Sequence, residues 1–108
     1  MTKMIFAKVH ERRGTAGSIS RVVALCDADL IGKVFKKGEV ELDLCKYARF
    51  YQGDKVSAEE AAELVRGADS VNAVGEKSVE AANRALGKTG SGGAKRVAGV
   101  PHLQIYRV

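Results

Sequence analysis

The chain has 108 residues, of which 45% are hydrophobic and 29% are charged, and these proportions predict one globular domain over residues 1–108. The net charge of +5 favours an acidic partner, nucleic acid above all, although the cations form no run of five or more. No apolar run approaches the roughly 18 residues that span a membrane, so we expect no membrane contact.

Several specialised classes of protein are disfavoured by motifs that the sequence lacks. The first residues contain no apolar segment followed by a small-residue cleavage site, so we expect a cytoplasmic protein with Cys26 and Cys45 as free thiols. No Cys or His lies in a short metal-ligand spacing, and the sequence therefore predicts no metal and no cofactor. The glycine-rich segment 87–93 lacks the upstream glycine of a phosphate-binding loop and follows a predicted helix.

Apolar alternation predicts strands in the first half of the chain. Residues 3–10 and 21–26 are rich in apolar side chains, and we expect them to form an antiparallel hairpin around a wide loop. Asp27 is expected to cap a short turn that ends at Gly32 in a left-handed conformation. Residues 39–45 alternate between acidic and apolar side chains, which predicts a half-buried strand.

The second half begins with an aromatic-rich segment, 47–55, which we expect to be a loop packed on the core. Ser57 and Glu60 have the spacing of a capping box, which predicts the start of a helix that ends at Gly67. Asn72 is interpreted as the N-cap of a second helix that ends at Gly87, and residues 95–108 as a final strand or bent pair. The fold class predicted is α+β, with a mostly antiparallel sheet of about five strands packed against two main helices.

Two groups of polar residues are candidates for a ligand site. His102, Gln104 and Tyr106 share one face of the last predicted strand, which is either a solvated surface or a row able to bind a ligand. Asn72 and Glu76 are explained by a helix N-terminus, but they could also join His102 and Gln104 in a ligand-binding site. His102 would then be the candidate general acid or base, with Glu76 as its acidic partner.

Three basic pairs are the candidate contacts to a nucleic acid. They are Arg12–Arg13, Lys36–Lys37 and Lys95–Arg96, and each could bind phosphates. Tyr51, Tyr106 or His102 could stack on bases.

Four segments together resemble a known family. They are residues 30–42, the aromatic-glycine step 50–53, the block 72–76 and the segment 99–104. They are similar to the archaeal uncharacterised family catalogued as domain of unknown function 424, over nearly the whole chain. The resemblance implies a compact, single-domain archaeal protein of the cytosol, and it supplies no reaction.

Three functions remain open from the sequence. The first is an RNA-binding accessory protein of translation or RNA handling. The second is a small enzyme or ligand-binding protein with a polar site at Asn72, Glu76 and His102. The third is an assembly subunit that forms a homo-oligomer through its C-terminal strand.

Overall fold

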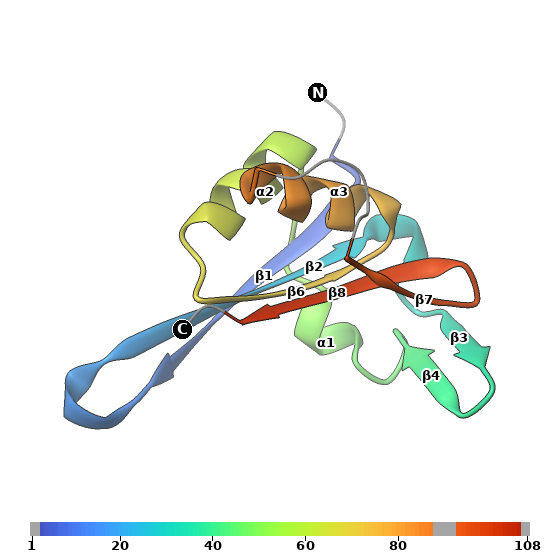
Figure 1. Ribbon diagram of the computed structural model, residues 1–108, viewed down its shortest axis with the longest axis horizontal. Coiled ribbons are helices and arrows are strands. Elements are labelled where there is room, and N and C mark those ends of the chain that lie inside the picture. The colour runs from blue at the N-terminus through green and yellow to red at the C-terminus, as the bar shows by residue number, and fades with distance from the viewer. Residues whose placement is uncertain (1–2, 88–92, 107–108) are drawn as a thin grey trace.

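A six-stranded sheet lies at the centre of the molecule in the computed structural model, which describes residues 3–87 and 93–106 (Figure 1). The strand order is β5-β1-β2-β6-β8-β7, and every neighbouring pair is antiparallel except β2 with β6. The α+β class and the mostly antiparallel sheet are thus confirmed, with one strand more than expected. The strands are β1 (Ile5–Arg13), β2 (Ile19–Asp27), β5 (Asp54–Val56), β6 (Ser70–Val74), β7 (Lys95–Val97) and β8 (Val100–Tyr106).

Helices α2 (Ala58–Arg66) and α3 (Glu76–Ala85) cover one face of this sheet (Figure 1). The other face carries the short helix α1 (Ala48–Tyr51) and a separate hairpin, β3 (Val34–Lys37) with β4 (Val40–Asp43). Two 3₁₀ turns, η1 (Thr15–Gly17) and η2 (Ala28–Leu30), follow β1 and β2. No helix in the described part of the chain is long and apolar enough to cross a membrane.

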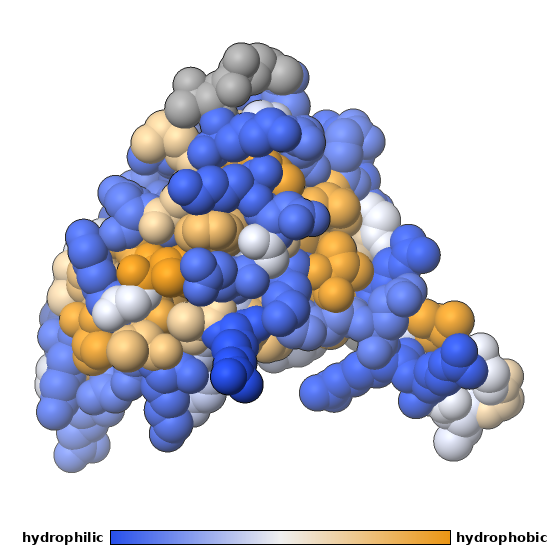
Figure 2. All heavy atoms as spheres, turned by 180° about the vertical axis from the view of Figure 1, so that it is seen from behind, coloured by the Kyte–Doolittle hydropathy of each residue, from blue (hydrophilic) through white to orange (hydrophobic). Residues whose placement is uncertain are grey.

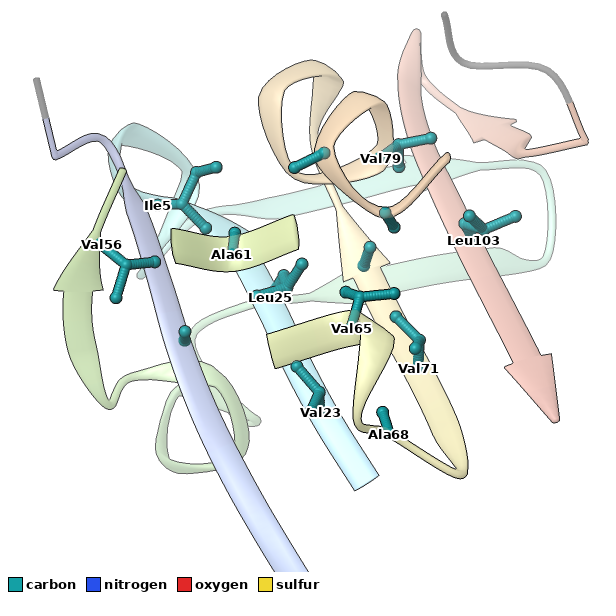
Figure 3. Packing of buried hydrophobic residues seen from close by; sticks show 14 residues of the cluster. Ile5, Val23, Leu25, Val56, Ala61, Val65, Ala68, Val71, Val79 and Leu103 are labelled. Atoms are coloured by element: carbon teal, nitrogen blue, oxygen red, sulfur yellow. The ribbon is translucent and has the colours of Figure 1, made fainter. Parts of the chain in front are cut away.

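Alternate side chains of the central strands pack into two hydrophobic cores, one on each face of the sheet. Under α2 and α3 the core includes Val23, Leu25, Val65, Val71 and Leu103 (Figure 3). Helix α2 begins with the expected capping box, because Ser57 Oγ accepts from the Glu60 N–H and the Glu60 carboxylate accepts from the Ser57 N–H.

The core on the other face contains Cys26, Leu44 and Tyr51 together with Leu42, Val74 and Val97. Burial raises the pKa of Cys26 to about 12, so this thiol stays uncharged and behaves as a small apolar side chain. Cys45 is exposed, and neither cysteine is in a disulfide.

The distal part of the β1–β2 hairpin, residues 11–21, extends beyond the sheet and is called the arm below. The β1–β2 ladder runs from Ile5↔Asp27 to Arg13↔Ile19, whereas β6 pairs with β2 only from Val22 to Cys26. The arm therefore projects from the body as a two-stranded ribbon (Figures 1 and 2). The hairpin predicted from residues 3–26 is confirmed.

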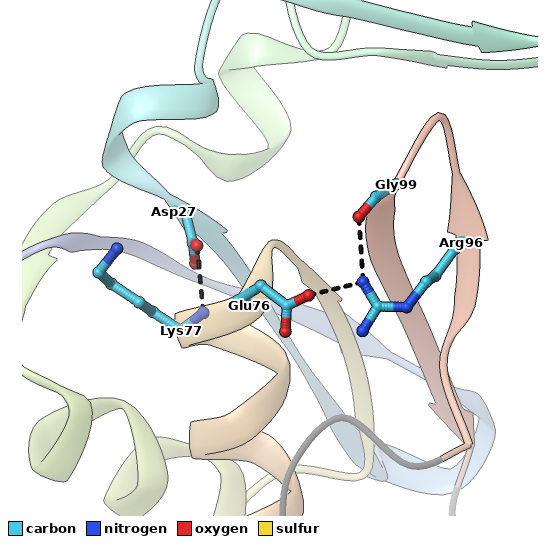
Figure 4. A network of polar contacts seen from close by, with 5 residues as sticks. All are labelled: Asp27, Glu76, Lys77, Arg96 and Gly99. Carbon is cyan, nitrogen blue, oxygen red and sulfur yellow. Dashed lines mark hydrogen bonds and ion pairs between the residues drawn. The ribbon is translucent and has the colours of Figure 1, made fainter.

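The expected N-cap at Asn72 is wrong, because Asn72 lies in the middle of β6 and α3 begins only at Glu76. The side chain of Asp27 caps α3 instead. Its carboxylate accepts a hydrogen bond from the Lys77 N–H at 3.1 Å (Figure 4). It also accepts from the Ser78 N–H at 2.8 Å and from Ser78 Oγ at 2.8 Å. Asp27 makes no side-chain cap bond to η2, so that expectation is also wrong.

Two other segments differ from expectation or cannot be compared. The aromatic segment 47–55 is not a simple loop, since it forms α1 and enters β5. Within the glycine-rich segment 87–93, residues 88–92 lie outside the described part of the chain.

Candidate functional site

A hydrogen-bonded cluster joins three elements on the sheet face opposite α2 and α3. Asn72 lies in β6, and its Oδ1 accepts from the Tyr51 hydroxyl of α1 at 2.7 Å. His102 of β8 contacts the same oxygen through Nε2 at 3.0 Å. Because Oδ1 is an acceptor, Nε2 of His102 carries the proton and Nδ1 is left as the acceptor. The cluster therefore fixes the histidine tautomer.

Burial keeps this cluster uncharged at neutral pH. It lowers the pKa of His102 and raises the pKa of Tyr51. A neutral imidazole and a neutral phenol that share one amide oxygen suit a site that recognises polar, uncharged groups.

The cluster forms the floor of an open cavity of about 400 Å³. Gln104 lies beside Asn72, because the two residues are partners in the β6–β8 register. Residues of β4 and of the segment that follows it also line the cavity, among them Leu42, Leu44 and Tyr47. This volume is within the range of ligand pockets.

A second cavity of about 470 Å³ adjoins the first, and the two share Phe50 and Asn72 as lining residues. It extends to Arg12 of the arm and to Tyr106 at the end of β8. We call the two cavities together the groove. It crosses the sheet from the arm toward the β3–β4 hairpin.

Contacts to β1 hold α1 in place beside the groove. The rings of His10 and Phe50 are stacked, with centroids 4.6 Å apart, and His10 Nε2 lies 2.9 Å from the Phe50 carbonyl oxygen. Lys8 Nζ donates to the Arg49 carbonyl oxygen at 2.7 Å. The sequence reasoning missed the roles of Tyr51 and His10 in the site, because their partners lie at least 21 residues away in the chain.

Glu76 does not join the cluster. Its carboxylate is 2.6 Å from Arg96 Nη1, and the same nitrogen donates to the Gly99 carbonyl oxygen at 3.0 Å (Figure 4). Side chains alternate along β7, so Arg96 lies on the α3 side, opposite Val97, which packs in the core beside Leu44. The structure thus brings Asn72, His102 and Gln104 together and places Glu76 across the sheet from them.

The basic residues predicted to bind phosphates lie at both ends of the molecule. Arg12 and Arg13 are exposed on the arm, and Arg12 lines one end of the groove. Lys36 and Lys37 are exposed on β3, which lies near β7 at the opposite end (Figure 1). Lys95 of β7 is the cross-strand neighbour of His102, and Arg96 is paired with Glu76 as described above. Within residues 3–87 and 93–106, no group of three or more His, Cys, Asp or Glu residues could bind a metal.

Acidification is expected to destabilise the protein through His102. Because burial lowers the folded-state pKa of His102 below 6.5, the unfolded chain binds a proton here before the folded protein does. The free energy of unfolding should then be maximal above pH 6.5, the ordinary pKa of histidine, and should fall as the pH drops below that value. Urea unfolding across this pH range measures the slope. His102→Gln keeps a donor for Asn72 and should flatten it, whereas a slope unchanged in this variant but lost in His10→Gln would contradict the assignment.

Comparisons with known proteins place the chain in a family and a fold. The model of a family described as "Protein of unknown function (DUF424)" matches residues 17–108. The structure is similar to the crystal structure of an uncharacterized conserved protein from Methanopyrus kandleri, an archaeon, with a TM-score of 0.75 and 28% sequence identity. The similarity covers 96% of this chain and 91% of that one. No curated protein matches the sequence.

Proposed function

The chain belongs to the DUF424 family of proteins of unknown function, and from the groove itself we propose that it binds single-stranded RNA. The observation that supports this most is the order of side chains along the groove. Arg12 lies at one end, the amide and imidazole groups of Asn72 and His102 lie in the middle, and Lys95 lies beside His102. A chain with alternating phosphates and bases matches this order.

Exposed aromatic rings add to the proposal. The side chain of Tyr106 is 73% exposed and that of Tyr47 is 55% exposed, and each lines one of the two cavities. An exposed tyrosine leaves the apolar surface of its ring in contact with water. A stacked base would cover that surface. Sequence-dependent contact with amide groups requires bases that are unpaired, which favours a single strand over a duplex.

The broader role that fits this site is that of an accessory protein of translation or RNA handling in the cytoplasm. The one histidine of the floor is hydrogen-bonded to an amide, whereas its proposed acidic partner Glu76 is bound to Arg96 across the sheet. The groove therefore offers recognition groups more readily than an acid–base pair. This arrangement favours binding over catalysis.

Removing the two arginines of the arm is expected to weaken RNA binding and reduce its salt dependence. For a single strand, each lost phosphate contact lowers the slope of log affinity against log salt by about 0.7. Arg12→Ala/Arg13→Ala should therefore reduce this slope by about 1.4 if both side chains contact phosphates. Fluorescence anisotropy with a labelled single-stranded RNA across a salt series measures both effects.

The matched control removes two arginines from the opposite face of the molecule. Arg66→Ala/Arg84→Ala changes the net charge equally but alters α2 and α3. Equal weakening by both double variants would show that net charge alone drives binding. No binding by the unmodified protein even at low salt would contradict the proposal.

Assembly through β8 is a second candidate, favoured by one feature of the sheet. Strand β7 pairs only with residues Val100 to His102 of β8. The outer backbone edge of β8 therefore continues past β7, and such an edge can pair with a strand of another copy. Light scattering distinguishes this candidate, since an oligomer formed through a strand edge would persist at high salt.

A further inference from the structure

The arm, residues 11–21, is an ordered ribbon whose side chains are all exposed (Figures 1 and 2). Its root is fixed to the body, because the Arg21 N–H donates to Asp69 Oδ2 at 2.7 Å and the Arg21 carbonyl oxygen accepts from the Asp69 N–H at 2.9 Å. Its tip is closed by a hydrogen bond of 2.8 Å from the Gly14 N–H to the Ser18 carbonyl oxygen. A two-stranded ribbon alone is only marginally stable in water. An arm fixed at its root and closed at its tip, with both faces open, is therefore a surface available to a partner.

Strand alternation divides the side chains of the arm between two opposite faces. Val9, just before the arm, is paired with Val23 of the core under α2 and α3. Glu11 and Arg13 follow Val9 at intervals of two, so their side chains continue that face of the ribbon. Arg12 lies on the other face, toward the groove, whose second cavity it lines. The two neighbouring arginines therefore project in opposite directions.

The charges of the arm leave one uncompensated cation on each face. Glu11 is the only acidic residue of the arm, and its Oε2 lies 3.2 Å from Nε of Arg21, its direct cross-strand partner. Arg12 and Arg13 take part in no ion pair within the described part of the chain. The tip beyond them, residues 14–18, contains only small, uncharged side chains. A thin tip with a cation on each face behind it suits insertion between two negatively charged surfaces.

We propose that the arm is inserted between two backbone segments of a folded RNA. The inference rests on the proposed RNA binding and specifies the substrate as an unpaired strand that occupies the groove and is joined to a paired stem. A strand that lies along the groove meets only the face of the arm that carries Arg12. A phosphate that reaches Arg13 must come from the other side of the ribbon, and the stem supplies that second backbone.

The composition of the arm favours a nucleic acid over a protein as the partner. Protein interfaces are centred on buried aromatic and apolar anchors, whereas Ile19 is the one large apolar side chain of the arm. Arginine suits phosphate in particular, because its planar guanidinium donates two parallel hydrogen bonds to a pair of oxygens. Three of the eleven residues of the arm are arginines, which matches a surface formed by phosphates.

The test compares two RNAs that share one unpaired sequence, of which the second continues into a short hairpin stem. Fluorescence anisotropy across a salt series measures the affinity of each. The RNA with the stem should bind more tightly, and its slope of log affinity against log salt should be steeper by about 0.9 for each phosphate of the stem that the arm contacts, the value for a duplex.

Single substitutions connect this preference to the two faces of the arm. Arg13→Ala should lower the slope by about 0.9 on the RNA with the stem and should leave binding of the unpaired strand nearly unchanged. Arg12→Ala should weaken the binding of both RNAs. The matched control is Lys77→Ala, which removes one exposed cation from α3 and should affect neither. An effect of Arg13→Ala that is equal on both RNAs, or no larger than that of Lys77→Ala, would overturn the inference.

A second variant removes the distal arm and retains the sheet. Replacing residues 13–19 with Asn-Gly joins Arg12 to Ser20, which are already cross-strand partners, through a two-residue turn. This protein should retain its affinity for the unpaired strand and lose the preference for the stem. Hydroxyl-radical footprinting of the RNA with the stem should show two protected backbone segments with the unmodified protein and one with the shortened arm. A single protected segment in both cases would show that the arm is not inserted.

These measurements distinguish a failure of the inference from a failure of the proposed function. Binding of the unpaired strand with no preference for the stem overturns the insertion and leaves the RNA-binding function standing. Binding of the stem through Arg13 without binding of any unpaired strand overturns the proposed function and supports the contact made by the arm. Absence of both overturns both. Polyglutamate that displaces the RNA with the stem at an equal concentration of charges would assign the arm to an acidic protein and overturn the inference.

Discussion

Replacing Gly75 with alanine is expected to lower the free energy of unfolding by roughly 3 kcal/mol or more, from backbone strain and overpacking together. Gly75 has φ +103° and ψ 158°, a backbone conformation that residues with a side chain rarely adopt. A methyl group at this position would also lie less than 3.0 Å from the carboxylate of Asp27. Thermal or urea unfolding of the variant measures the loss.

The collision with Asp27 matters because that carboxylate holds the start of α3. Asp27 is buried and accepts three hydrogen bonds, one from Lys77 (Figure 4) and two from Ser78. A carboxylate displaced from these donors leaves buried polar groups unpaired, which adds to the cost. Gly75 is therefore required by a close approach between β2 and α3 as well as by its own backbone conformation.

Substitutions at two other glycines serve as controls that separate the cost of backbone strain from the cost of the collision with Asp27. Gly32 has φ +89° and nothing within 4 Å of an added methyl group, so Gly32→Ala reports strain alone. Gly67 has φ −92° and its nearest neighbour at 3.9 Å, so Gly67→Ala should change the free energy of unfolding by less than about 1 kcal/mol in either direction. A Gly75→Ala loss no larger than that of Gly32→Ala would contradict the role given to Asp27.

The sequence predicts an element well when the signal for that element lies within its own residues. Apolar alternation identified the β1–β2 hairpin, and the spacing of Ser57 and Glu60 identified the start of α2. The orientation of β8 was also predictable, since Leu103 is buried while Gln104 and Tyr106 are exposed. Each of these signals extends over a few neighbouring residues, so no tertiary information was needed.

The elements around Asn72 were not predictable in this way. Val71 and Val74 are spaced three apart, as on a helix, but both are buried on a five-residue strand with cores on either side. An apolar stretch this short fits a buried strand and a helix equally well. The cap that defines α3 comes from Asp27, which is 50 residues from Lys77 in the chain. A pattern of neighbouring residues cannot indicate a partner that is so distant in the chain.

The candidate site was only partly predictable, because some of its contacts also join residues that are distant in the chain. His102 and Gln104 were identified from strand alternation, and Asn72 from its polar character, although in the wrong element. Tyr51 was expected either to pack on the core or to stack on a base. Its hydroxyl bond to Asn72 depends on how α1 docks beneath the sheet. That docking involves a second close approach, at Gly53, which the sequence analysis included only in the aromatic-glycine step 50–53.

Replacing Gly53 with alanine is expected to destabilise the fold by about 2 kcal/mol or more and to open the site. An added methyl group would lie less than 3.0 Å from the Ala7 carbonyl oxygen and 3.0 Å from Lys8 Cα. Strand β1 cannot yield here, because Ala7 is paired with Leu25 on one side and Asp54 on the other. The segment between α1 and β5 must move instead.

A movement of this segment would also change the site, and that change can be measured separately from the loss of stability. Burial raises the pKa of Tyr51 above the ordinary value of a tyrosine, so its phenol ionises only at a higher pH than a hydrated phenol does. If α1 shifts, Tyr51 leaves Asn72 and becomes hydrated, and a spectrophotometric titration of the folded variant should show this tyrosine ionising at lower pH. RNA affinity should fall with it, since Tyr51 no longer orients Asn72. A Gly53→Ala protein with unchanged tyrosine titration and unchanged stability would show that α1 docks without this close approach, and the link from Gly53 to the groove would be wrong.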